Sequence, residues 1–109
     1  MNKRTLTALR GSIKKWEAIV EGNGAERGTY NCPLCKVFHK GDCKGCPVVI
    51  ETGLLACDGT PYEDWAHFID CYHLRTINKM PPEYRTKARK LAQAELDFLR
   101  SLLPGKEKL

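Results

Sequence analysis

The amino-acid sequence predicts a small, mainly α-helical fold: three helices packed with a loop-rich, four-cysteine zinc module that is inserted between the first helix and the second. Apolar residues recur at three- and four-residue intervals in three segments, over residues 4–21, 61–78 and 82–103. Five of the six cysteines lie between the first two of these segments. A chain of 109 residues is most simply one domain, here 1–109.

The first segment, residues 4–21, places its apolar side chains on one helical face. These residues are Leu6, Leu9, Ile13, Trp16 and Val20. A turn at Gly22 and Gly24 then stops the helix.

The stretch between the first two helical segments, residues 22–60, contains seven glycines and has no sustained period. We expect loops there, with short strands around 36–39 and 48–50. A loop of this length is improbable in a compact domain unless a cross-link holds it. The segment is therefore expected to be a cysteine and metal module.

The second helical segment, residues 61–78, begins with a capping pattern: Thr60 as cap, Pro61 at the first helical position and Glu63 closing a capping box.

The third helical segment, residues 82–103, follows Pro81 and ends before Pro104. Its apolar face includes a carboxylate, Glu95, for which we expect a basic partner. The side chains expected in the core are Trp16, Trp65, Ile69, Tyr72, Leu91 and Phe98.

Two Cys-x-x-Cys pairs, Cys32 with Cys35 and Cys43 with Cys46, predict one tetrahedral zinc site. Each pair closes a tight turn that directs two sulfurs toward one point, and four thiolates complete the coordination of Zn²⁺. Three alternatives remain open: an iron–sulfur cluster, disulfides, and thiol redox chemistry at the first pair.

Other cysteines and histidines leave the ligand set open. Cys57 is a possible substitute ligand, and His39 lies between the two pairs. His67 and Cys71 are spaced to share one helical face, where packing is the simpler role because no fourth ligand accompanies them.

The composition limits the environment in which the chain is expected. No apolar run approaches the roughly 20 residues of a membrane span, and no signal peptide is recognisable at the start. We expect a cytoplasmic protein without a membrane partner, in which reduced cysteines bind metal. The net charge of +5 permits contact with nucleic acid or with an acidic protein surface.

The cysteine pattern also resembles short bacteriophage and prophage proteins that have no characterised function. The residues that carry the resemblance are Cys32-Pro-Leu-Cys35, Cys43-x-x-Cys46-Pro47, Thr52-Gly53, Cys57 and Gly59-Thr60-Pro61-Tyr62, after a helix that bears Trp16. The resemblance covers about residues 13–65 and implies a viral origin and a metal-binding module. It implies the host cytoplasm as the location, but no activity.

The sequence is consistent with three functions. The first is a non-enzymatic, zinc-stabilised binding protein that engages a host protein, with inhibition of a host defence or nucleic-acid-processing enzyme as one version implied by the resemblance alone. The second is a nucleic-acid-binding, zinc-finger-like regulator, whose contacts would be Arg85, Arg89, Lys90 and Arg100. The third is an iron–sulfur or thiol redox protein. An enzyme is not expected, because paired carboxylates, a nucleophile elbow and a phosphate-binding glycine loop are not recognisable.

Overall fold

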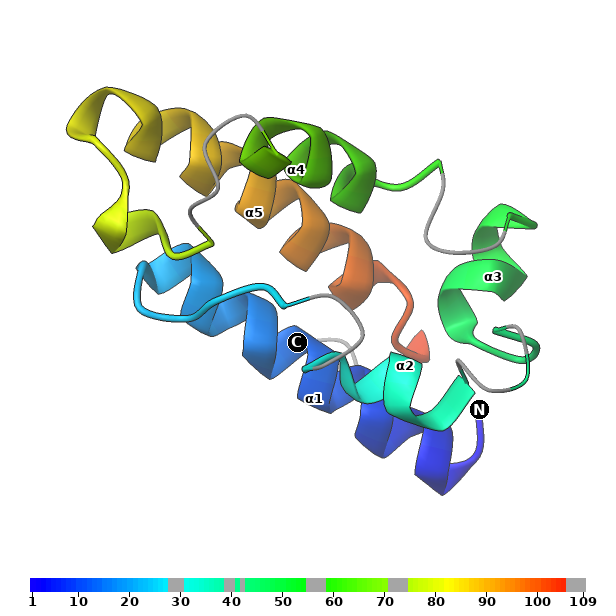
Figure 1. Cartoon of the computed structure of the whole chain (residues 1–109). Helices are drawn as coiled ribbons and strands as arrows, with labels where there is room; N and C mark the ends of the chain where they lie inside the picture. Colours follow the sequence, from blue (N-terminus) through cyan, green and yellow to red (C-terminus); the bar gives the residue numbers. More distant parts are fainter. Residues whose placement is uncertain (28–30, 39–40, 42, 55–58, 71–74, 106–109) are drawn as a thin grey trace.

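The computed structural model describes residues 1–27, 31–38, 41, 43–54, 59–70 and 75–105, and these residues form a mainly helical, compact fold (Figure 1). The helices are α1 (Lys3–Glu21), α2 (Pro33–Phe38), α3 (Pro47–Thr52), α4 (Pro61–Asp70) and α5 (Pro82–Ser101), with a 3₁₀ turn, η3 (Ile77–Lys79), before α5. The described residues include no strand. The predicted helical class is therefore confirmed.

Helix α1 is capped at both ends by residues next to it. The Asn2 side chain accepts a hydrogen bond from the Thr5 N–H, which satisfies one of the first-turn donors. At the other end Gly22 adopts a left-handed conformation (φ 106°) and donates its N–H to the carbonyls of Ala18 and Ile19. The predicted limits of 4–21 agree with α1 to within one residue.

Helices α1 and α5 lie side by side, α4 packs on α5, and α2 packs on α1 (Figure 1). Two tryptophans join these layers: Trp16 of α1 meets Trp65 of α4 edge to face, with ring centroids 5.4 Å apart. Of the predicted core residues, Trp16, Trp65 and Ile69 are buried, whereas Leu91 and Phe98 are only partly buried at the edge of the core. Tyr72 lies outside the described residues.

The region expected to be one helix over 61–78 is divided in the structure. Helix α4 is described as far as Asp70, residues 71–74 lie outside the description, and Thr76 is extended (φ −121°, ψ 122°) before η3. The Asn78 N–H bonds to the Gly22 carbonyl at the end of α1, with an N–O distance of 3.0 Å. This attachment brings the chain across the end of α1, which a continued α4 would not do.

The cysteine segment contains helices where short strands were expected. Residues 33–38 and 47–52 form α2 and α3, and each helix begins at a proline, Pro33 or Pro47. Proline at the first helical position has a backbone angle that suits a helix and lacks only an N–H that would have no helical partner. Local chain geometry therefore outweighs the β propensity of valine and isoleucine here.

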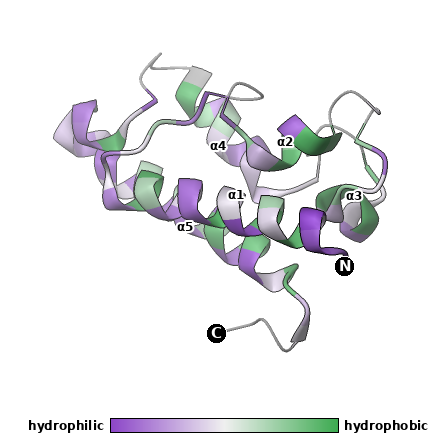
Figure 2. Cartoon of the chain, turned by 90° about the horizontal axis from the view of Figure 1, so that it is seen from below, coloured by the Kyte–Doolittle hydropathy of each residue, from purple (hydrophilic) through white to green (hydrophobic). Residues whose placement is uncertain are grey.

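Figure 2 shows hydrophobic and hydrophilic positions gathered on different faces of α1 and α5, whereas α3 is largely hydrophobic. The apolar faces of α1, α4 and α5 meet in the core. Within the described residues, none of the helices combines the length and the apolar character that a membrane crossing requires.

Candidate metal centre

Two cysteines occupy equivalent places in the backbone, each directly before a proline that opens a short helix. The Cys32 carbonyl accepts a hydrogen bond from the Lys36 N–H, and the Cys46 carbonyl accepts one from the Ile50 N–H, both with N–O distances of 3.0 Å. The repeated Cys-Pro step in the sequence therefore becomes a repeated helix start. No disulfide joins Cys32 or Cys46 to another residue.

The Cys32 sulfur lies among several hydrogen-bond donors. The Cys35 N–H is 3.3 Å from Cys32 Sγ, and the Cys35 thiol and the buried Ser12 hydroxyl also donate to it. Together these effects lower the pKa of Cys32 to about 6. The hydrogen bond from the Cys35 side chain is the largest cause, the positive charge of Lys15 adds to it, and burial opposes both. Cys32 is thus prepared to be a thiolate, the form that binds metal.

The second pair combines an unusual backbone at Cys43 with a buried thiol at Cys46. Cys43 has a left-handed backbone (φ 66°), which is uncommon for a residue with a side chain. Burial raises the pKa of the Cys46 thiol, and the nearby backbone N–H groups of Val48 and Val49 oppose this rise without forming a cap hydrogen bond. Negative charge on Cys43 and on Cys32 also raises the pKa of Cys46.

The described residues do not bring three metal-binding side chains close enough to hold an ion. Cys57, His39 and Cys71 lie outside the described residues, and His67 is exposed on α4. The predicted site therefore stays a prediction for Cys32, Cys35, Cys43 and Cys46. The structure adds a backbone N–H donor, that of Cys35, to the Cys32 sulfur at the start of α2.

The arginines proposed for nucleic-acid contact all bind within the protein. Arg85 donates to the carbonyls of Met80 and Asn78, which secures the chain before α5. Arg89 donates to the Val20 carbonyl at the end of α1, with an Nε–O distance of 2.9 Å. Arg100 and Glu17 form an exposed ion pair at 3.0 Å, and Lys90 is exposed.

A buried polar cluster behind the cysteines was not predicted. Glu26, only 2% exposed, binds the Lys15 ammonium at 2.6 Å. Glu95, for which a basic partner is expected from the sequence, feels the positive charge of Lys15, and its Oε2 atom has no hydrogen-bond partner. Glu95 inside an apolar stripe was the one sequence signal for this cluster, because Lys15 and Glu26 look like ordinary surface residues.

Comparison of the chain with protein-family models, with curated proteins and with solved structures finds no match.

Proposed function

We propose that this protein is a non-enzymatic binding module whose cysteine segment is stabilised by one Zn²⁺ on Cys32, Cys35, Cys43 and Cys46. The observation that carries the proposal is the pair of Cys-Pro helix starts, the first of which directs the Cys35 N–H to the Cys32 sulfur at 3.3 Å. Hydrogen bonds of this kind favour the thiolate form and orient the sulfur before metal arrives.

Zinc would supply a cross-link that the segment otherwise lacks. Bound by four thiolates it has no open position for substrate, so its contribution is to the stability of the fold. The protein's own residues do the remaining work: Ser12 and Lys15 of α1 stabilise charge on Cys32. Binding of the ion would draw the second pair, Cys43 and Cys46, to the first.

A protein partner agrees better with the surface than nucleic acid does. On α3 and directly after it, two large apolar side chains are open to solvent, Ile50 at 74% and Leu54 at 49% exposure. Neighbouring exposed apolar side chains are typical of protein contacts. The guanidinium groups of Arg85, Arg89 and Arg100, by contrast, already have partners within the chain. A viral origin and a host partner belong to the same proposal, and they rest on the resemblance of the cysteine spacing.

Elemental analysis of protein purified under reducing, anaerobic conditions tests the metal assignment. We expect one zinc per chain and a colourless protein. Cys43→Ser should lose the metal, because three thiolates provide neither the charge nor the geometry of four. Cys57→Ser is the matched control and should retain it.

Several results would contradict this assignment. A brown protein that contains iron would replace zinc with an iron–sulfur cluster. Full metal retention in Cys43→Ser together with loss in Cys57→Ser would assign the fourth ligand to Cys57. Titration of labelled DNA and RNA at two salt concentrations should give no binding tighter than about micromolar, and tight, salt-dependent binding would favour the nucleic-acid alternative.

A further inference from the structure

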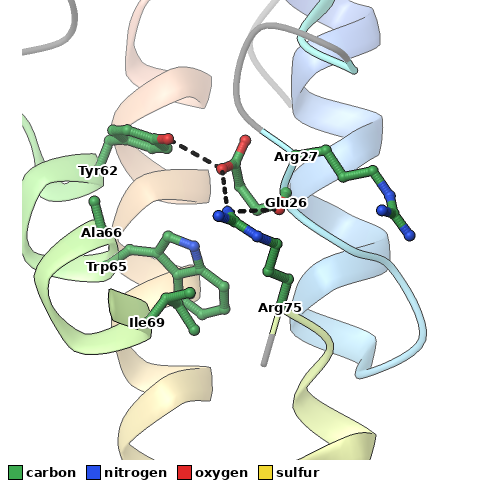
Figure 3. Close-up of a pocket in the computed structure, with 7 residues that line it drawn as sticks. All are labelled: Glu26, Arg27, Tyr62, Trp65, Ala66, Ile69 and Arg75. Atoms are coloured by element: carbon green, nitrogen blue, oxygen red, sulfur yellow. Dashed lines mark hydrogen bonds and ion pairs between the residues drawn. The ribbon is translucent and has the colours of Figure 1, made fainter. Parts of the chain in front are cut away.

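A pocket of about 230 Å³ lies between α4 and the two chain segments that cross beside it (Figure 3). One side is apolar and consists of Trp65, Ala66 and Ile69 from α4. Tyr62, also on α4, reaches across to Glu26 with its hydroxyl, and the opposite side consists of Glu26 and Arg27 together with Arg75, which precedes η3. The pocket contains none of the proposed zinc ligands.

One donor on the apolar side has no acceptor. Trp65 is 1% exposed, yet its indole Nε1 has no hydrogen-bond partner. Buried indole N–H groups usually find an acceptor, because an unsatisfied buried donor destabilises the folded state. Figure 3 shows the nitrogen-bearing edge of the ring turned toward the side where Glu26 and Arg75 meet.

The carboxylate of Glu26 is already occupied and does not fill this role. Its Oε1 atom binds Lys15 at 2.6 Å, and its Oε2 atom accepts from the Tyr62 hydroxyl at 3.0 Å. Arg75 lies 4.0 Å from the same Oε2 atom and donates through one terminal nitrogen to the Glu26 carbonyl. The Arg75 side chain is 51% exposed. The pocket therefore offers the Trp65 N–H and the Arg75 guanidinium as donors, beside a Glu26 carboxylate whose two oxygens already accept from Lys15 and Tyr62.

We propose that this pocket binds a small organic carboxylate with one aromatic or branched apolar group. The carboxylate accepts from Trp65 Nε1 and pairs with the Arg75 guanidinium, and the apolar group lies against Ala66 and Ile69. A guanidinium and a second fixed donor suit the two oxygens of a carboxylate. The volume holds a single ring and excludes a nucleotide or a larger cofactor.

Titration of the metal-loaded protein with phenylacetate, followed by the NMR signals of the two indole N–H groups, tests the proposal. We expect a saturable shift of the Trp65 signal, because its N–H gains an acceptor. A probe of about ten non-hydrogen atoms should bind with a Kd near the millimolar range. Trp65→Phe assigns the signal by removing it, and Trp16 provides the internal reference.

Matched probes and variants separate the proposed contacts. Phenylacetamide, which keeps the ring and loses the charge, and acetate, which keeps the charge and loses the ring, should each bind at least about tenfold more weakly. Arg75→Gln should weaken phenylacetate binding about tenfold. Arg27→Gln removes a lining residue whose guanidinium points away from the pocket in Figure 3, and it should change the Kd by less than about twofold.

Three results would overturn the proposal. The first is a Trp65 signal that does not respond to phenylacetate. The second is equal affinity for phenylacetate and its amide. The third is a Kd that Arg75→Gln leaves unchanged. None of these measurements depends on which thiols bind zinc, so a failed pocket and a failed metal assignment are distinguishable.

Discussion

The helical scaffold formed by α1, α4 and α5 and the cysteine segment, residues 31–54, are stabilised in different ways. The scaffold has two helices of 19 and 20 residues, and it buries side chains such as Leu9, Trp65 and Leu96. The cysteine segment has two helices of six residues each. Isolated helices shorter than about 12 residues are marginal in water, so these two depend on other contacts.

Those other contacts come from packing against the core. Leu34 packs in the core and donates its N–H to the Ser12 hydroxyl of α1. Val48 enters the same core from α3, whereas Ile50 remains 74% exposed. We expect apolar burial to maintain the scaffold, whereas under the zinc proposal the metal adds to the stability of the cysteine segment. The predictions below test this division.

Removal of zinc by a chelator under reducing conditions is expected to have the largest effect on stability. The effect should be confined to the cysteine segment. Structural zinc contributes on the order of 10 kcal/mol of binding free energy, which the segment would lose. Hydrogen exchange followed by mass spectrometry should show loss of amide protection in residues 31–54 and retained protection in α1 and α5. Equal loss in α5 would show that the two regions unfold as one unit.

Trp65→Ala is expected to lower the free energy of unfolding of the scaffold by about 3–5 kcal/mol, because a fully buried indole leaves a cavity. The measurement is chemical denaturation monitored by circular dichroism. Ile50→Ala, at an exposed position of the cysteine segment, is the control and should change stability by less than about 0.5 kcal/mol. A loss well under about 1 kcal/mol for Trp65→Ala would contradict its place in the core.

Glu95 makes the stability of the scaffold dependent on pH. Burial raises the pKa of Glu95 to about 8, and the negative charges of Cys32 and Glu26 add to this shift. The Tyr62 N–H and the positive charge of Lys15 lower the pKa but do not cancel the effect of burial. Between the ordinary pKa of 4.5 and about 8 the folded state binds a proton that the unfolded state has released. The contribution of the neutral carboxyl is therefore complete below pH 4.5 and disappears as the pH rises through about 8.

Glu95→Gln should remove this dependence. Because the variant stays neutral, we expect it to be more stable than the natural protein above pH 8, by on the order of 2–4 kcal/mol. Near pH 4 the two proteins should be alike, which is the internal control. Denaturation curves measured from pH 4 to 9 decide this, and parallel pH profiles for the two proteins would refute the account.

A glycine at the end of a helix in each region allows the two regions to be compared by single substitutions. Gly22 and Gly53 both have positive φ values, 106° and 72°, as residues that end α1 and α3. A Cβ atom at Gly22 would collide with the side chain of Asn78, whereas a Cβ atom at Gly53 would meet nothing within 4 Å. Gly22→Ala combines backbone strain with a clash.

We therefore expect thermal denaturation to show a loss of about 2–3 kcal/mol for Gly22→Ala and about 1 kcal/mol for Gly53→Ala. Equal losses would mean that the attachment of Asn78 to the end of α1 adds little to the stability of the scaffold.

The sequence by itself determined the helical class and the limits of α1 and α5, because apolar spacing and the neighbouring prolines and glycines act within a few residues. It also identified Trp16, Trp65 and Ile69 as core residues. The zinc ligands remain a prediction from spacing. Short-range signals were sufficient for these assignments, because each depends on residues that are close together in the chain.

Only the tertiary structure decided the remaining features, since each depends on how different elements of the fold meet. The bond from Asn78 to Gly22 divides the expected second helix, and 56 positions separate the two residues. Lys15 and Glu26 form a buried ion pair that no local pattern marks. The unpartnered Trp65 Nε1 faces Arg75 across a pocket that exists only when α4 and the crossing segments meet. Desolvation and charge proximity are properties of that assembled interior, so the chemistry of these polar groups follows from the fold.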